Sequence, residues 1–413
     1  MAQEPIKNLL PRLSTRREYF DYLDRWTVGT VDELRARMTT RALCKAYMLE
    51  TSHSNGKRDA LAALGGPVEL APVDDTLFRL TWAEDDGDWA LVEIEDQRYP
   101  VVYTMVESDV ANRRIERMVA SSPLLDRSWF AAQVFLQLWS VVIAAYPAHR
   151  FSRLVFEHES VFQRPEVDAG ESAAAQADEA DALDTGDPEH EAAFERRRAR
   201  VQITERIGKM VASVLPWTKS YDPLASIIQL RVPAPVQGGH DVYYNGQFTN
   251  RSDSMLPFRQ TVRDVMQLYR TATERVEGAA WPRADESSAA PSLPVSLGAP
   301  LLIQFSEMLD LETFKRWIAA LHRKNNRFRL WGNPIWLGEG KAHLYAVDNH
   351  LWQPIDLEIT RDHVYALLPQ GTCGNTVHRL VTNIQRFVDP KLRVFIGEKP
   401  YEDFVAGAVP DNR

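Results

Sequence analysis

The chain has 413 residues, of which 45% are hydrophobic and 25% charged, and its formal net charge is −9. These proportions are ordinary for a folded globular protein that buries a core without help from disulfides or metals. Subtracting the ten acidic charges that lie between Pro165 and Phe194 leaves +1, so net charge argues neither for nor against a nucleic-acid partner.

Cysteine usage and the apolar segments predict the compartment. The two cysteines, Cys44 and Cys373, are far apart in the sequence, which favours a reducing compartment. The first five residues lack the basic segment and apolar run of a signal peptide. The uncharged stretch Trp129–Tyr146 contains Gln133 and Gln137, and it reads better as the centre of a large domain than as a membrane span. We therefore expect a cytoplasmic protein without a membrane partner.

Two segments divide the chain. Residues 165–193 are rich in Ala, Asp and Glu and cannot bury enough apolar area to fold, so they predict a disordered acidic insert. Residues 278–298 are rich in Ala, Ser and Pro and predict a linker. The remaining pieces are 1–164, a helical N-terminus followed by an α+β domain, then 194–277, an α/β segment, and 299–413, a C-terminal α+β domain. The middle piece is short for an independent domain, so we expect it to pack onto a neighbour.

The first piece begins with helix signals. Two stretches fit a capping box, Thr15–Glu18 and Thr30–Glu33. A third helix is expected at about 40–50, and Asp109 and Asp126 suit the N-caps of two more. Alternating apolar residues predict the strands of this piece, which are 77–83, 89–94, 99–106 and 150–162.

The other two pieces complete the predicted fold. The middle piece reads as a basic helix at 196–214, strands at 226–232 and 241–249 with a turn at Asn245–Gly246, and a helix at 256–276. The last piece reads as strands at 301–305, 327–337, 342–347, 355–359, 364–368 and 392–396, a helix after Asp310, and a second helix at 375–388. The fold class is therefore α+β, with mixed or antiparallel sheets flanked by helices, a helical N-terminus and a disordered acidic insert.

The segment between Leu367 and Arg379 is the strongest candidate for a ligand site. A strand enters a glycine-containing loop that opens a helix, and free backbone amides at a helix start attract anions. The candidate anion- or phosphate-binding residues are Gly371, Thr372, Gly374, Asn375, Thr376, Arg379 and Arg386. The Gly-Lys-Ser/Thr of a Walker A motif is absent. The alternative is that the glycines only make the turn and a Thr or Asn caps the helix.

Cys373 is a candidate nucleophile, because a thiol at a helix N-terminus has a lowered pKa. His378 lies on the wrong side of the helix to act as its base. A base would have to come from the preceding strands, from His343, His350 or His363. The alternative is a small buried core residue.

Metal and cofactor signals are weak. His343, Asp348 and His350 are ligand types, but no recognised metal motif accompanies them, and Asp348 with its neighbour suits a turn. Glu93 and Glu95 alternate on a strand like part of a nuclease site, although acids at such positions usually face solvent. We therefore expect neither a metal nor a cofactor.

A basic cluster is the candidate nucleic-acid contact, and it comprises Arg196, Arg197, Arg198 and Arg200. The alternative is a solvated charged face, and the acidic insert just before it is able to fold over the arginines. A helix-turn-helix around 30–50 is a further DNA-binding alternative, although no glycine marks its turn.

These observations favour an intracellular binding or interaction protein that belongs to a larger complex, with a protein partner and a nucleic acid or nucleotide phosphate as a further contact. The alternative is an enzyme, either a cysteine-nucleophile hydrolase or a phosphate-ligand enzyme, that uses Gly371–Thr376. We prefer the first because no candidate catalytic group has a partner at a spacing that defines a role.

Overall fold

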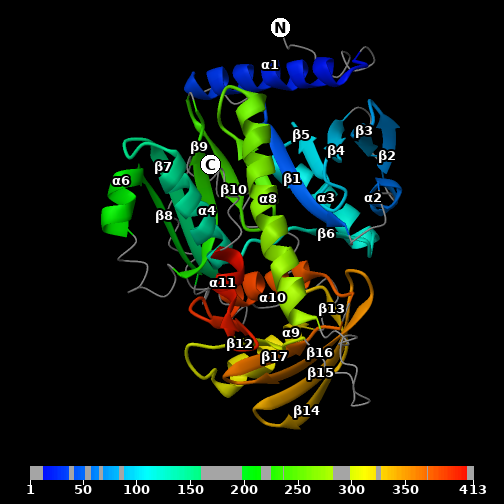
Figure 1. The fold of residues 1–413 in the computed structure, drawn as a ribbon, viewed down its shortest axis with the longest axis vertical. Helices are drawn as coiled ribbons and strands as arrows, with labels where there is room; N and C mark the ends of the chain where they lie inside the picture. The colour runs from blue at the N-terminus through cyan, green and yellow to red at the C-terminus, as the bar shows by residue number, and fades with distance from the viewer. Residues whose placement is uncertain are drawn as a thin grey trace, which may run out of the picture.

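The structure is a computed structural model, and it describes residues 13–36, 41–51, 57–64, 68–82, 88–159, 198–214, 225–235, 237–281, 298–321, 327–369 and 371–406. Its strands form two antiparallel sheets, and helices cover and join them (Figure 1). The predicted α+β class is confirmed. The acidic insert 165–193 and most of the linker 278–298 lie outside the described residues.

The first sheet has eleven described strands in the order β2-β3-β4-β5-β1-β11-β10-β9-β7-β8, with β6 paired to the far end of β1. These strands are β1 (Lys45–Thr51), β2 (Val68–Pro72), β3 (Leu77–Trp82), β4 (Trp89–Glu93), β5 (Val101–Thr104), β6 (Leu125–Arg127), β7 (Phe151–Glu159), β8 (Arg198–Arg206), β9 (Ile227–Pro233), β10 (Gly239–Tyr243) and β11 (Gln247–Asn250). Because β11 pairs with β1, strands from 1–164 and from 194–277 share one sheet.

The helices of this half pack on that sheet. They are α1 (Arg16–Arg35), α2 (Lys57–Ala63), α3 (Ser108–Ser121), α4 (Ala132–Ala145), the short α6 (Ile207–Lys209) with a π-helical turn at Met210–Val214, and α8 (Met255–Ala280). The 26-residue α8 runs from the end beside α1 down to the second sheet (Figure 1). Its apolar residues, among them Phe258, Val265 and Tyr269, face the core. No described helix has the length and apolar character needed to cross a membrane.

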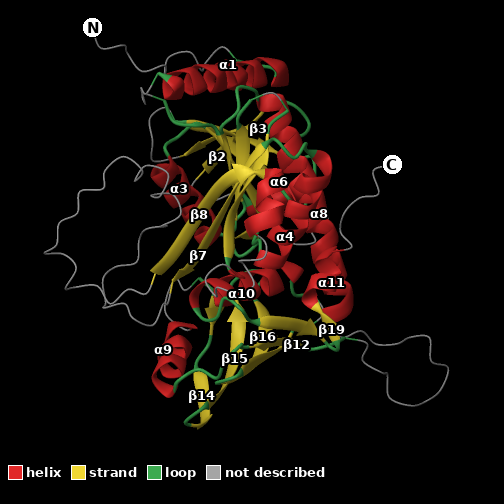
Figure 2. Cartoon of the chain, turned by 90° about the vertical axis from the view of Figure 1, so that its left-hand side faces the viewer, coloured by secondary structure: helices red, strands yellow, loops and turns green. Residues whose placement is uncertain are grey.

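The second sheet has eight described strands in the order β13-β15-β16-β17-β12-β18-β19, with β14 paired to β15. Its elements are β12 (Leu301–Gln304), α9 (Leu311–Leu321), β13 (Leu330–Trp331), β14 (Pro334–Gly338), β15 (Lys341–Asp348), β16 (Gln353–Thr360), β17 (His363–Leu367), α10 (Gly374–Phe387), β18 (Arg393–Ile396), β19 (Lys399–Pro400) and α11 (Tyr401–Ala406). Helix α9 lies on one side of this sheet, where Phe314, Trp317 and Ile318 are buried (Figure 2).

Helix α10 lies between the two sheets (Figure 1). Its apolar stripe, which includes Val377, Leu380 and Ile384, belongs to the core. Its polar stripe is also buried, because it faces β6 and β7 of the first sheet rather than water. An amphipathic pattern normally predicts one solvated face. Here the polar side chains bind carboxylates of both sheets, Asp126 and Glu157 in the first and Asp348 in the second.

Two predicted helices are strands instead. Residues 45–51 form β1, whose side chains are all buried in the centre of the first sheet, so their run of apolar residues reflects burial on both faces. This strand also removes the second helix of the helix-turn-helix alternative. Residues 198–206 form β8, in which Val201 and Ile203 alternate with polar residues and pair along β7.

Some of the predicted helix starts are confirmed and others are wrong. The capping box at Thr15 is confirmed, whereas Thr30 lies inside α1 and its hydroxyl donates to the Trp26 carbonyl. Helix α3 begins after Glu107, not at Asp109, and Asp126 is a buried residue of β6. The turn at Asn245–Gly246 is confirmed, with Gly246 at a φ of 75°.

Candidate functional site

The start of α10, where the sequence predicts an anion site, already holds an internal carboxylate. The Gly374 amide donates a hydrogen bond of 2.8 Å to Oε1 of Glu277 on α8. A Cβ on Gly374 would lie 2.8 Å from Cγ of Glu277 and 2.9 Å from the Thr273 carbonyl oxygen. The glycine is therefore required by the close approach of α8, and the positive end of the α10 dipole faces a carboxylate of the same chain.

Arg98 connects this carboxylate to the first sheet. Its Nε donates to Oε1 of Glu50 on β1 at 2.7 Å, and its Nη2 donates to Oε1 of Glu277 at 2.5 Å. The same Nη2 lies 3.4 Å from Sγ of Cys373. All four side chains are buried, so Arg98 neutralises charge that would otherwise be costly inside the protein.

The environment of Cys373 does not produce a reactive thiolate. The thiol donates to Oε1 of Glu50 at 2.9 Å, and it is the N-cap residue of α10. Burial and the neighbouring Glu50 carboxylate raise the pKa of the Cys373 thiol well above its usual value, against the opposing effect of Arg98. The lowered pKa expected at a helix N-terminus is therefore not found.

The next polar residues of α10 bind the first sheet and a turn of the second. The Asn375 amide nitrogen donates to Oδ2 of Asp126 at 3.1 Å, and the Thr376 hydroxyl donates to Oδ2 of Asp348 at 2.5 Å. Arg379, which is 0% exposed, forms ion pairs with both Asp126 and Asp348. Burial alone would raise the pKa of Asp126, but Arg379 and Arg329 beside it hold the pKa below its usual range.

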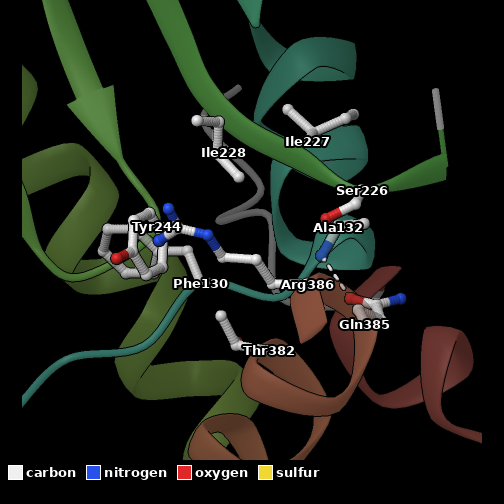
Figure 3. A pocket seen from close by; sticks show the side chains of 9 residues that line it. All are labelled: Phe130, Ala132, Ser226, Ile227, Ile228, Tyr244, Thr382, Gln385 and Arg386. Atoms are coloured by element: carbon white, nitrogen blue, oxygen red, sulfur yellow. Dashed lines mark hydrogen bonds between the residues drawn. The ribbon is translucent and has the colours of Figure 1, made fainter. Parts of the chain in front are cut away.

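Arg386 is stacked and paired within the protein. Its guanidinium forms an ion pair with Glu157 of β7 and lies 4.3 Å from the centre of the Tyr244 ring. Arg386, Tyr244, Phe130 and Gln385 line a gap between α10 and the first sheet (Figure 3). The gap is too narrow to admit a water molecule, so it does not hold a ligand in this conformation.

The remaining loop residues make the turn itself. Gly371 has a φ of 95°, in the left-handed region that glycine adopts most readily, and the Thr372 hydroxyl donates to the Pro369 carbonyl at 2.7 Å. The structure thus corrects the expected open phosphate loop. The Gly374 amide and the guanidiniums of Arg379 and Arg386 are each bound by carboxylates of the same chain.

The predicted basic cluster is only partly described. Arg196 and Arg197 lie outside the described residues, and the structure describes no side chain for Arg198. Arg200 lies on β8, with its Nη1 3.7 Å from Oε2 of Glu157. Of the two acids predicted to face solvent, Glu93 at the end of β4 is instead buried and forms ion pairs with Arg16 and Arg259, so the expectation was wrong for that residue.

Of the three residues considered as metal ligands, Asp348 and His350 stay in contact, because the His350 amide donates to Oδ1 of Asp348 at 2.9 Å, whereas His343 lies on the outer face of the sheet. His343 pairs with Asp356, and Asp348 pairs with Arg379. His350 also joins Glu50 and Cys373, so that one potential ligand atom from each lies within 4.8 Å of the others. Sequence reasoning missed Glu50, and it also missed Arg98 and Glu277. Their local patterns carry no signal, because only the pairing of distant segments brings them together.

The outer face of the second sheet, on the side away from α9, is rich in apolar and aromatic side chains. Register places Ile335, His343, Glu358, Tyr365, Leu302 and Phe395 in one row across six strands. A neighbouring row holds Tyr345, Asp356 and Leu367. Trp331 is 67% exposed, Tyr345 63% and Leu367 54%. We call Trp331, Ile335, Tyr345, Tyr365 and Leu367 the outer-face cluster.

Charges on this outer face balance locally. His343 pairs with Asp356, and Nζ of Lys341 lies 2.8 Å from Oε1 of Glu358. Both pairs join diagonal positions on the adjacent strands β15 and β16. The part of the face on β15 and β16 is therefore aromatic with paired charged groups, unlike the basic surfaces that bind phosphate backbones.

Comparison with known proteins identifies the family. The model of the MJECL33-like protein family matches residues 9–177 and 239–402, which is most of the chain. The chain belongs to the MJECL33-like family. The matched ranges contain Glu50, His350 and Cys373 as well as the outer-face cluster, whereas β8 and β9 fall in the gap between them.

One curated MJECL33-like relative is similar along almost its whole length. It is "Uncharacterized protein MJECL33" of Methanocaldococcus jannaschii, 19% identical over 401 residues that cover 93% of this chain and 94% of the relative. No solved structure matches the chain. These names state no activity, so function is argued from the geometry.

Proposed function

We propose that this MJECL33-like protein is an intracellular interaction component, and that it binds a partner protein on the outer face of its second sheet. The observation that carries the proposal is the outer-face cluster, five large apolar side chains on one face of an antiparallel sheet, all at least 40% exposed. A concentration of exposed apolar side chains on one face is typical of protein interaction sites. Aromatic residues are also the usual energetic anchors of such interfaces.

The charged residues on the outer face indicate which class of partner it binds. A nucleic acid would need uncompensated cations beside the aromatic rings, because phosphate neutralisation supplies most of the affinity. Here Asp356 and Glu358 lie in the middle of the face, and each is paired with a basic residue. We therefore infer a protein partner that presents an apolar, weakly charged surface.

The other functions considered from sequence have less support. A phosphate ligand would compete with Glu277 for the Gly374 amide, and Cys373 is buried with a raised pKa. The two free buried thiols, Cys44 and Cys373, are compatible with a reducing compartment such as the cytoplasm.

The test compares the outer face with one exposed apolar residue elsewhere on the protein. A photo-crosslinking residue placed at Tyr345 identifies the partner, which is then purified and titrated against the full-length protein. The double change Trp331→Ser/Tyr345→Ser should weaken binding at least about tenfold, as expected for interface anchors. Leu256→Ser, at a residue that is 71% exposed on α8, is the matched control and should leave binding unchanged.

Other occupants of the face would give distinct results. Equal affinity of the double variant and the wild type would overturn the proposal. A dimer that dissociates on the same double change, measured by light scattering, would make a second copy the occupant instead. Oligonucleotide binding that depends on Trp331 and Tyr345 would favour a nucleic-acid platform and contradict the inferred partner class.

A further inference from the structure

Three potential metal ligands from distant segments converge where the two sheets meet. Glu50 lies on β1, His350 in the turn between β15 and β16, and Cys373 at the start of α10. Their ligand atoms lie within 4.8 Å of one another, and all three side chains are buried. Glu50 and Cys373 are 323 residues apart in sequence, so only the folded protein brings the set together.

Two of these side chains each carry a buried polar atom with no hydrogen-bond partner among the described residues. These atoms are Oε2 of Glu50 and Nε2 of His350. Glu50 is 0% exposed and His350 is 1% exposed, so bulk water does not satisfy them. An unpaired buried polar atom is destabilising, and two such atoms beside one thiol indicate a missing binding partner.

The other ring nitrogen of His350 and the other carboxylate oxygen of Glu50 are already hydrogen-bonded, as the atoms of metal ligands that do not bind the ion usually are. Nδ1 of His350 lies 3.2 Å from the Pro123 carbonyl oxygen, which fixes the proton on Nδ1 and leaves a lone pair on Nε2. Oε1 of Glu50 accepts from Arg98, so Oε2 is the oxygen left to bind an ion. This division between one anchored and one unused atom is typical of histidine and carboxylate ligands.

Local charge also suits a dication. Burial raises the pKa of Glu50 to about 7. With Glu50 ionised, Glu50 and Glu277 carry two negative charges against the single positive charge of Arg98, which leaves one in excess. On binding, the Cys373 thiol, and Glu50 where it is protonated, would release a proton to solvent, and the sulfur lone pair would form a bond to the metal. The group would then carry two excess negative charges, which a divalent cation neutralises.

We propose that Glu50, His350 and Cys373 bind one Zn²⁺ ion that fastens the first sheet to the second. One sulfur, one nitrogen and one oxygen ligand match the preferences of Zn²⁺, and a water molecule would complete a tetrahedral set. Tetrahedral Zn²⁺ needs ligand atoms roughly 3.3–3.8 Å apart, so small side-chain rotations would close the site. The proposal is independent of the docking function.

The experiment uses the full-length protein and both of its cysteines. Protein produced with zinc present is analysed by elemental analysis, and protein refolded with Co²⁺ is examined for the near-ultraviolet absorption of a thiolate bound to cobalt. Cys44→Ser is the matched control, because Cys44 is also a free buried thiol but is not in the cluster. Circular dichroism reports whether each variant folds.

We expect about one zinc per chain in the wild type and in Cys44→Ser, as for a specific site. Cys373→Ser should hold little zinc and lose the thiolate–cobalt band. If Cys373→Ser does not fold, the band in Cys44→Ser still assigns the thiolate to Cys373, the one remaining cysteine. A wild type without stoichiometric zinc and without the band would overturn the proposal, as would a band lost in Cys44→Ser.

Discussion

The α10 junction and the outer face of the second sheet use their side chains in opposite ways. At the junction, Arg379 is fully buried and paired with Asp126 and Asp348. On the outer face, Trp331 and Tyr345 are mostly exposed. Buried charges are tolerated only when they are paired, whereas exposed aromatic clusters mark surfaces that contact other molecules. The polar loop at the start of α10 is therefore structural, and the apolar face of the second sheet is the better candidate for function.

The largest effect should come from removing a junction charge. Arg379→Met leaves two buried aspartates without their shared cation and should lower the free energy of unfolding by about 3–5 kcal/mol. Arg316→Met is the matched control, because Arg316 is 52% exposed and pairs with Glu312 one helical turn away, so it should cost about 0.5 kcal/mol or less. Urea unfolding measures both, and equal costs would remove the distinction between the two regions.

A smaller effect concerns a buried polar group within the first sheet. Both ring nitrogens of His240 have hydroxyl partners, Thr261 and Ser252, and burial lowers the pKa of His240 to about 4 against the opposing charge of Asp241. Between about pH 6.5 and pH 4 the unfolded chain therefore binds a proton that the folded chain does not.

This linkage gives a pH dependence with a defined sign. The contribution of neutral His240 to stability is complete near pH 7 and falls by up to about 3 kcal/mol as the pH drops to 4. The difference in unfolding free energy between wild type and His240→Gln should shrink over that range. A difference that stays constant would show that the folded chain binds the His240 proton over the same pH range as the unfolded chain. The surroundings of His240 would then be more hydrated than its burial indicates.

The smallest effect on stability should come from the outer face. Tyr345→Ser removes a ring that is 63% exposed and should change the free energy of unfolding by about 0.5 kcal/mol or less. Trp317→Ala, which removes a ring that is 1% exposed on α9, should cost about 3–5 kcal/mol. If Tyr345→Ser proved as destabilising as Trp317→Ala, the outer face would be part of the core rather than a docking surface.

Sequence reasoning recovered elements whose pattern is local. The helix predicted at 375–388 is α10 at 374–387, because its apolar spacing and the preceding turn are both local signals. Strands β15 and β16 alternate strictly and were found for the same reason, whereas the single strand predicted at 327–337 is two strands, β13 and β14. In contrast, β1 was taken for a helix, because a strand buried on both faces shows no alternation.

The site was harder to predict than the fold. The sequence predicted the helix that begins at Gly374, but it could not reveal that Glu277 would bind the Gly374 amide and Asp126 would bind Asn375 and Arg379. Those acids reach α10 only through the path of α8 and the pairing of β6 with β1. The local sequence around Gly374 therefore does not distinguish a loop that binds a ligand from a junction held by internal salt bridges.

Hydrogen–deuterium exchange of the full-length protein, alone and bound to its purified partner, reports both regions in one experiment. We expect new protection in β14 to β17 on binding, with exchange in residues 371–379 unchanged. Protection confined to 371–379, with β14 to β17 exchanging as in the free protein, would contradict this expectation and return the function to the α10 loop.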